Sequence, residues 1–372
     1  MKKAYLLGLG LAFGISHAAF AQSSVTLYGV IDTGVELITH GSPTGGFLAR
    51  MPTISAGEYP SRWGLTGSED LGGGLSAIFK VENGFTPGTG GLLLGGRLFG
   101  RQALVGLKDK RWGRLTFGRQ NNMTLLGMAE ADVNGPDSMG AGSFDNYLAN
   151  ARADNTIEYL GKFSGLTVGL TYSFGRDTSA VGNCGGEIAG DQMACRQITA
   201  MLKYDSARWG TAAIYDEQRG GPGATAMTVV PGLTGVAFTR SSDTDRRYQV
   251  NGYFLLGDVK VGGGWIHRRV QGDVQSVTTD LTYLGMRVPV NFWDFSTQIS
   301  HIDNHEFPAS GTLINARVAY NLSKRTAVYL LAGYVFNGKH SVYSVSGSSL
   351  APAMPAPGIG QLGAVVGMRH LF

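Results

Sequence analysis

Apolar and polar residues alternate along much of the chain, most regularly in the segment LTVGLTYSFG, residues 166–175. Leu166, Val168 and Leu170 fall on one side of an extended backbone, and the small or polar Thr167 falls on the other. A period of two places successive side chains on opposite faces of a β-strand. The segment therefore predicts a strand with one apolar and one polar face.

The same alternation recurs in other parts of the chain, and it predicts further strands. In FWDFSTQISHI (292–302), for example, Asp294, Ser296 and Gln298 form the polar side. We find no helical period longer than two turns outside residues 121–150. The other clear strand segments are 25–37, 74–85, 103–110, 246–256, 259–269, 314–322 and 326–336.

Short and long connections alternate between these strands. The short connections are 69–74, 108–114, 161–165, 205–210, 257–258, 289–291 and 321–326. The long ones are 39–57, 84–96, 120–153, 176–195, 218–244, 270–275, 303–311 and 338–357. Seven short turns and eight long loops separate sixteen strands. An even strand number with short turns at one rim and long loops at the other is typical of an outer-membrane barrel.

Alternation alone also fits a soluble β-sandwich, so the choice of a membrane barrel depends on three further features. Aromatic residues near strand ends suit the interfacial girdles of a barrel. The loops differ in length as just described, and the chain starts with an export signal. The aromatic residues are Tyr28, Trp63, Phe85, Trp112, Phe117, Trp209, Trp293, Tyr334 and Phe336. We predict an all-β fold, a 16-stranded antiparallel transmembrane β-barrel with short periplasmic turns and long extracellular loops.

Residues 1–21 have the pattern of a secretory signal peptide. Lys2 and Lys3 precede an apolar run, and the run leads to an A-x-A motif that ends at Ala21. We expect cleavage after Ala21, which leaves residues 22–372 as a single transmembrane β-barrel. No later run of 18 or more apolar residues predicts a transmembrane helix.

Charge and cysteine content narrow the function further. The formal charge is +4, and it becomes +2 without the two signal lysines, which argues against a nucleic-acid partner. The two cysteines, Cys184 and Cys195, enter an oxidising compartment, so we expect a disulfide between them. His301 and His305 form H-x-x-x-H without the glutamate of a zinc-protease motif. We expect no catalytic site, no metal site and no cofactor.

Several segments resemble the general diffusion porins of Gram-negative outer membranes, especially the betaproteobacterial branch. They span the mature chain in family order. They are SVTLYGVIDTGVE, SRWGLTGSEDLGGGLSAIFKVENGF, GRLFGRQALVGLKDKRWGRLTFGRQ, RADNTIEYLGKFSGLTVGLTYSFG, LSKRTAVYLLAGYVFN and VGMRHLF.

This resemblance implies a homotrimer in the outer membrane, in contact with outer-membrane lipid and lipopolysaccharide. It implies passive diffusion of small hydrophilic solutes and ions. The terminal Phe372 resembles the aromatic residue that serves these barrels as an assembly signal. A lipid-facing strand end explains Phe372 equally well.

The resemblance also places the pore constriction. The long loop at about 120–153, the third in the family, is expected to fold into the lumen, and it offers the acids Glu130, Asp132, Asp137 and Asp145. An arginine ladder is expected on the opposite wall, formed by Arg62, Arg101 and Arg152, with Arg119 as a further candidate. A basic position that the family has on its first strand is Val30 here. A field between arginines and acids selects ions by sign, so we expect weak anion selectivity.

Two other functions stay open on the sequence. A substrate-specific outer-membrane channel needs an aromatic track along one wall, and no such run is visible. The other is a barrel with a plugged lumen that acts as an enzyme or an adhesin. The enzyme would need a nucleophile–base pair, and the adhesin would need larger loops. Single-channel conductance with a series of ions and sugars distinguishes these functions from general diffusion.

Overall fold

The computed structural model describes residues 24–54, 57–135, 138–144, 151–178, 184–347 and 352–372. These residues form seventeen strands, one short α-helix and one 3-10 helix. The predicted signal peptide lies outside the described residues. The strands of the first half are β1 (Ser24–Thr39), β2 (Phe47–Arg50), β3 (Arg62–Gly72), β4 (Leu75–Gly84), β5 (Gln102–Asp109), β6 (Gly113–Asn121), β7 (Arg152–Phe163) and β8 (Leu166–Ser173).

The second half continues the same succession of strands. They are β9 (Gln197–Asp205), β10 (Trp209–Arg219), β11 (Thr244–Leu256), β12 (Val259–Gln271), β13 (Ser276–Val290), β14 (Trp293–Asn304), β15 (Ser310–Asn321), β16 (Thr326–Asn337) and β17 (Gln361–Leu371). The helices α1 (Met123–Met128) and η1 (Ala141–Ser143) lie in the connection between β6 and β7.

The sheet closes on itself because β1 pairs with both β3 and β17. Residues 24–30 of β1 pair with β3, and residues 30–38 pair with β17, all antiparallel. Gly29 and Phe372 exchange two backbone hydrogen bonds of 3.0 and 3.1 Å at this seam. A closed barrel leaves no strand edge unpaired, which is what a lipid environment requires. The predicted 16-stranded antiparallel barrel is confirmed, with β2 as a short additional strand beside β1.

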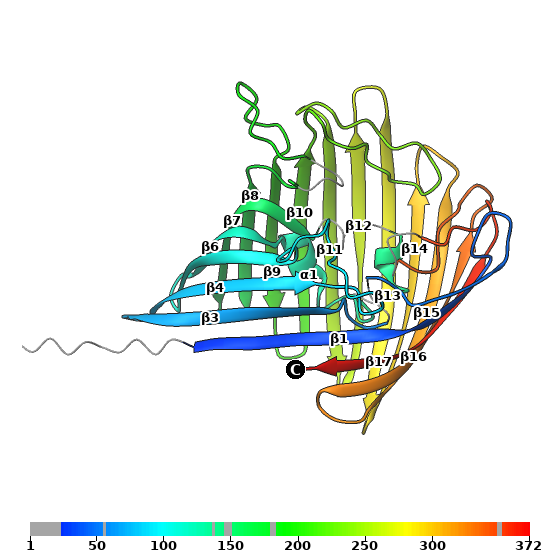
Figure 1. Ribbon diagram of the computed structural model, residues 1–372, viewed down its shortest axis with the longest axis horizontal. Coiled ribbons are helices and arrows are strands. Elements are labelled where there is room, and N and C mark those ends of the chain that lie inside the picture. Colours follow the sequence, from blue (N-terminus) through cyan, green and yellow to red (C-terminus); the bar gives the residue numbers. More distant parts are fainter. Residues whose placement is uncertain (1–23, 55–56, 136–137, 145–150, 179–183, 348–351) are drawn as a thin grey trace, which may run out of the picture.

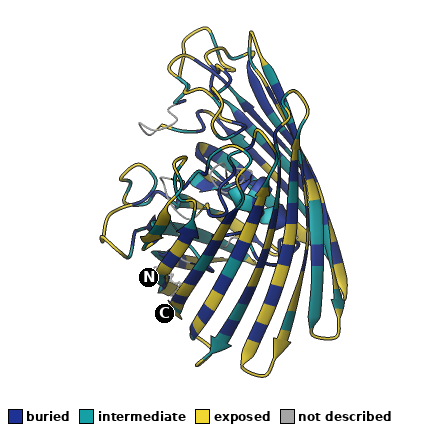
Figure 2. Cartoon of the chain, turned by 90° about the vertical axis from the view of Figure 1, so that its right-hand side faces the viewer, coloured by how far each residue is buried: buried dark blue, intermediate teal, exposed yellow. Residues whose placement is uncertain are grey.

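The burial pattern has the polarity of a membrane barrel. In β14, the apolar Trp293 is 44% exposed and the polar Ser296 is 5% exposed. Alternate residues of this strand are exposed and buried along its length. Figure 2 shows the same alternating bands on neighbouring strands. The apolar side therefore faces outward, and the polar side faces the lumen.

The aromatic residues predicted for the interfacial girdles divide into two groups. Trp209, Trp293 and Phe336 are large exposed side chains at strand ends, where a girdle would place them. Tyr28 is different, because its hydroxyl donates a 2.8 Å hydrogen bond to Glu82 in the lumen. Its assignment to the girdle was wrong, since Tyr28 lies on the polar face of β1.

The connections agree with the expected alternation, with two differences. Figure 1 shows long loops above β8 to β14 and short turns at the other rim. The connection between β12 and β13 has only four residues, 272–275, because β12 extends two residues beyond its predicted end. The first long loop contains β2, which pairs with the end of β1.

Candidate functional site

The candidate site includes the connection between β6 and β7. We call residues 122–144 of this connection the constriction loop. Figure 1 shows α1 inside the ring of strands. Thr124 donates a 2.8 Å hydrogen bond to Asp216 of β10, and the Asn134 amide donates a 2.6 Å hydrogen bond to Asn315 of β15. The loop is therefore attached to the inner wall at two distant strands.

Glycines on the inner wall allow this close approach. A Cβ atom on Gly262 of β12 would lie 2.4 Å from the Ala131 carbonyl oxygen, and one on Gly285 of β13 would lie 2.4 Å from Val133. Neither distance is possible for a real side chain, so only glycine lets the loop pack here. The close approach of the constriction loop is thus the reason for glycine at these two strand positions.

Arg62 and Arg101 lie together on the wall and share one acid. The Nε of Arg101 donates a 2.7 Å hydrogen bond to Glu82, and the Nε of Arg62 lies 3.8 Å from the same carboxylate. Lys80 lies 3.7 Å from Glu82 as well. Glu82 was not predicted as a site residue. It alternates with the apolar residues of β4, so the sequence pattern could have placed it on the polar face of that strand.

Arg152 and Arg119 extend this group across β6 and β7. Arg152 interacts electrostatically with Arg101, Arg119, Arg62 and Glu82. Its Nε is buried and has no hydrogen-bond partner among the described residues. Arg152 therefore lies within electrostatic reach of the other three arginines predicted from the sequence. We keep the name arginine ladder for Arg62, Arg101, Arg119 and Arg152.

Asp154 neutralises part of the ladder. Its carboxylate accepts a 2.6 Å hydrogen bond from Arg119 and one of 3.2 Å from Arg97. Arg97 also pairs with Asp177 at 3.0 Å. The ladder and its ionic neighbours comprise six cations and three acids, a local excess of three positive charges. The cations are Arg62, Lys80, Arg97, Arg101, Arg119 and Arg152, and the acids are Glu82, Asp154 and Asp177.

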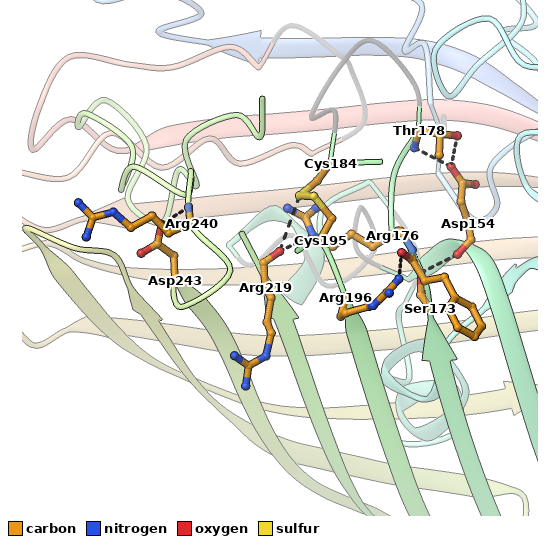
Figure 3. The surroundings of a disulfide bond; sticks show 12 residues. Asp154, Ser173, Arg176, Thr178, Cys184, Cys195, Arg196, Arg219, Arg240 and Asp243 are labelled. Carbon is orange, nitrogen blue, oxygen red and sulfur yellow. Dashed lines mark hydrogen bonds between the residues drawn. A yellow bond between two sulfur atoms is a disulfide. The ribbon is translucent and has the colours of Figure 1, made fainter. Parts of the chain in front are cut away.

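The predicted disulfide forms between Cys184 and Cys195, with their Cα atoms 5.1 Å apart. Figure 3 shows that this disulfide and Asp154 lie in one region of the rim, with Thr178 beside Asp154. Thr178 donates hydrogen bonds of 2.8 and 2.7 Å to Asp154 from its backbone nitrogen and its hydroxyl. The neighbouring Asp177 forms a backbone bridge with Cys184. The disulfide loop therefore helps to hold the acid that pairs with Arg119.

The acids of the constriction loop occupy different surroundings. Glu130 pairs with Lys260 of β12, and none of the ladder arginines is its partner among the described residues. Asp132 is buried. Asp137 and Asp145 lie outside the described residues.

A second ionic cluster lies on β12 to β17 and was not predicted. It contains Lys260, Arg287, Arg317 and Arg369 as cations, with Glu58, Glu130, Asp132 and Asp294 as acids. The sequence had offered Glu130 and Asp132 as loop acids and Asp294 on the polar side of its strand, but nothing in it indicated that they meet these cations. Glu58 reaches the cluster from the first long loop, and its carboxylate lies 3.0 Å from Arg369 and 3.5 Å from Arg317.

Tyr59 connects the two groups of arginines. The guanidinium carbon of Arg62 lies 5.8 Å from the centre of its ring, and that of Arg369 lies 5.6 Å from it. Cations within about 6 Å of an aromatic ring are attracted to its face. The first long loop therefore enters the lumen together with the constriction loop.

The described part of the chain contains no group of three His, Cys, Asp or Glu side chains that could hold a metal ion. No helix among the described residues is long and apolar enough to cross a bilayer.

The chain matches a family model described as Gram-negative porin over residues 8–340. It is 38% identical over 235 residues to an outer membrane porin protein of Bordetella pertussis, a match that covers 58% of this chain and 60% of that protein. It is 28% identical to outer membrane porin protein 32 of Delftia acidovorans over the full length of both proteins.

Solved structures share the fold. An anion-selective porin from Comamonas acidovorans superposes with a TM-score of 0.77 at 24% identity, covering 94% of this chain and all of that one. A trimer form of OmpT from Vibrio cholerae superposes with a TM-score of 0.68 at 15% identity, covering 94% of this chain and 99% of that one.

Proposed function

Because the chain belongs to the Gram-negative porin family, we propose that it forms a water-filled pore in the outer membrane. Small hydrophilic solutes and ions diffuse through this pore passively, with a weak preference for anions. The outward apolar faces contact lipid, and the inward polar faces solvate the permeating solute.

The observation that carries the anion preference is the positive excess around the arginine ladder. Arginine stays charged at any physiological pH, and a water-filled lumen hydrates it. Low-dielectric walls concentrate the field of such a cluster and raise the local concentration of counter-ions. The second ionic cluster has equal numbers of cations and acids, so it adds no further excess. The small size of the excess is the reason to expect a weak preference.

The relatives support this proposal by analogy. The Comamonas structure with the same fold is described as an anion-selective porin. We propose that the chain also assembles as a homotrimer, as the trimer form of the Vibrio OmpT does. Cleavage of a signal peptide after Ala21 stays part of the proposal, on the strength of the A-x-A motif.

Reversal potentials across a potassium chloride gradient test the anion preference. We expect a potential of the sign that chloride permeation produces, and a conductance that rises with salt without saturation. The preference should shrink between about 0.1 and 1 M salt, because the screening length falls from about 10 to about 3 Å. A potential of the opposite sign contradicts anion selectivity, and a protein that carries no current contradicts the pore itself.

A further inference from the structure

A cavity of about 210 Å³ lies between the second ionic cluster, the constriction loop and the first long loop. Its walls are mostly polar, and the charged residues of the second cluster line it. The arginine ladder does not contribute to this lining, apart from the shared contact with Tyr59. The cavity is therefore a separate place in the lumen where a solute can be held.

The charges around this cavity are balanced and come from different parts of the chain. All four cations project from barrel strands, namely β12, β13, β15 and β17. Three of the four acids come from the two inserted loops, and only Asp294 belongs to a strand. Cations on the wall and acids on the inserted loops produce a field across the cavity, with no net charge in its lining.

Two side chains offer unused hydrogen-bonding capacity to a solute. Arg287 donates from Nε and Nη2 to Asp294, which leaves its Nη1 hydrogens without a partner among the described residues. Glu130 pairs with Lys260 through Oε2, and its Oε1 accepts no hydrogen bond from the described residues. Each side chain is about half exposed, at 49% for Arg287 and 47% for Glu130. Arg287 and Glu130 both line the cavity, and each keeps an atom without a hydrogen-bond partner among the described residues.

We propose that this cavity is a binding station for small zwitterions of the amino-acid class. The solute carboxylate accepts hydrogen bonds from Arg287, and the solute ammonium group donates to Glu130. This assignment names a solute class for the pore and so rests on the proposed function.

The balance of charge explains why a zwitterion is favoured over a simple anion. A zwitterion brings one charge of each sign, so it can use both free groups and leave the lining without net charge. An anion on the free Nη1 of Arg287 adds a negative charge beside Asp294 that no further cation compensates. A cation on the free oxygen of Glu130 adds a positive charge beside Lys260 in the same way. A neutral solute gains none of the charge-assisted hydrogen bonds.

Four solutes with the same three-carbon frame test this preference at neutral pH. Alanine is the zwitterion, lactate the anion, alaninamide the cation and lactamide the neutral analogue. Saturation-transfer NMR from the detergent-solubilised protein to the solute methyl group detects weak binding and does not depend on conduction. We expect a saturable signal from alanine, a signal at least about tenfold weaker from lactamide, and no signal with empty micelles.

Two variants locate the binding in this cavity. Glu130→Gln and Arg287→Gln should each weaken alanine binding by about tenfold or more, since each removes a charge-assisted hydrogen bond. Glu130→Gln should also gain affinity for lactate, because Lys260 loses its acid. Arg287→Gln should gain affinity for alaninamide, because Asp294 loses its cation. Glu69→Gln and Arg325→Gln are matched controls, since both residues are exposed and lie outside the cavity lining.

Equal signals from alanine and lactamide overturn the proposal, and so does alanine binding that survives both cavity variants. Circular dichroism of each variant shows whether the barrel is intact. Conductance measured on the same preparations separates the two hypotheses. A conducting pore without alanine binding refutes only the zwitterion station, whereas alanine binding without conductance refutes only the pore.

Discussion

One carboxylate, that of Glu82, partly neutralises the positive charge at one end of the arginine ladder. Glu82 accepts hydrogen bonds from Tyr28 at 2.8 Å and from Arg101 at 2.7 Å, and Arg62 and Lys80 lie within 4 Å of it. One acid therefore serves three cations, and the cations stay in excess. Arg152 increases that excess, because no acid hydrogen-bonds to it among the described residues.

Replacing Glu82 by glutamine should make the pore more anion-selective. Glutamine keeps the size of the side chain and removes one negative charge from the narrow region. A unit charge at a few ångströms in water is worth about 0.5–1 kcal/mol, so the ratio of chloride to potassium permeability should rise roughly two- to fivefold. Reversal potentials at low salt measure the ratio. Glu69→Gln in an exposed position is the control, and an unchanged ratio in Glu82→Gln would show that the ladder does not set selectivity.

The described residues of the constriction loop contact the barrel wall at several places. Hydrogen bonds tie it to β10 and β15, and Met139 packs beside Gly333 and Gly363 on β16 and β17. The last long loop adds a further contact, since the Gly347 nitrogen donates a 2.9 Å hydrogen bond to the Ser138 carbonyl. With this many attachments, we expect the loop to keep one position in the open pore.

Enlarging Gly262 tests that attachment. A Gly262→Val side chain would collide with the Ala131 carbonyl, so the loop must leave the wall and move into the lumen. We expect a lower single-channel conductance and more current noise in the open state. Ala213→Val places a similar group on the exposed side of β10 and should conduct like the original chain. A full, quiet conductance in Gly262→Val would show that the loop position does not limit the pore.

At the scale of the whole molecule, the distribution of polarity decides the environment. The closed barrel buries Asp294, Ser296 and Gln298 toward its lumen and exposes Phe295 and Ile299 outward. This is the reverse of a soluble sandwich, where the apolar side would form the core. A hydrocarbon environment makes the outward apolar surface favourable, and the wet lumen hydrates the charges.

Native mass spectrometry of the protein purified from outer membranes tests the proposed assembly and processing together. We expect three copies of the subunit, because association would cover part of the outward apolar surface. Each subunit should begin at Gln22, because the signal peptide is expected to be cleaved after Ala21. Denaturation should reduce the signal to single subunits of the same mass. A native species of one subunit would refute the trimer, and a subunit that still begins at Met1 would refute the cleavage.

The strands and their orientation could be predicted from the sequence, because a period of two is a local property. Segment 292–302 shows its two faces without reference to any other part of the chain, and it matches β14 within two residues at each end. Seven short and eight long connections implied sixteen strands, and the export signal, the loop lengths and the aromatic residues near strand ends favoured a closed membrane barrel over a sandwich. The ladder arginines were named from their segments' resemblance to a known family. The structure brings them near one another, and their role in the pore stays a prediction.

The pairing of charges could not be predicted in this way, because it depends on where the inserted loops come to rest. Glu130 meets Lys260 across 130 positions of the chain, and Glu58 meets Arg317 and Arg369 from a loop near the opposite end. No local pattern encodes these distances. The sequence by itself determined the alternating strands, the barrel and the arginines of its wall. Only the tertiary structure decided which acids neutralise which cations, because Coulomb energies depend on distances in space.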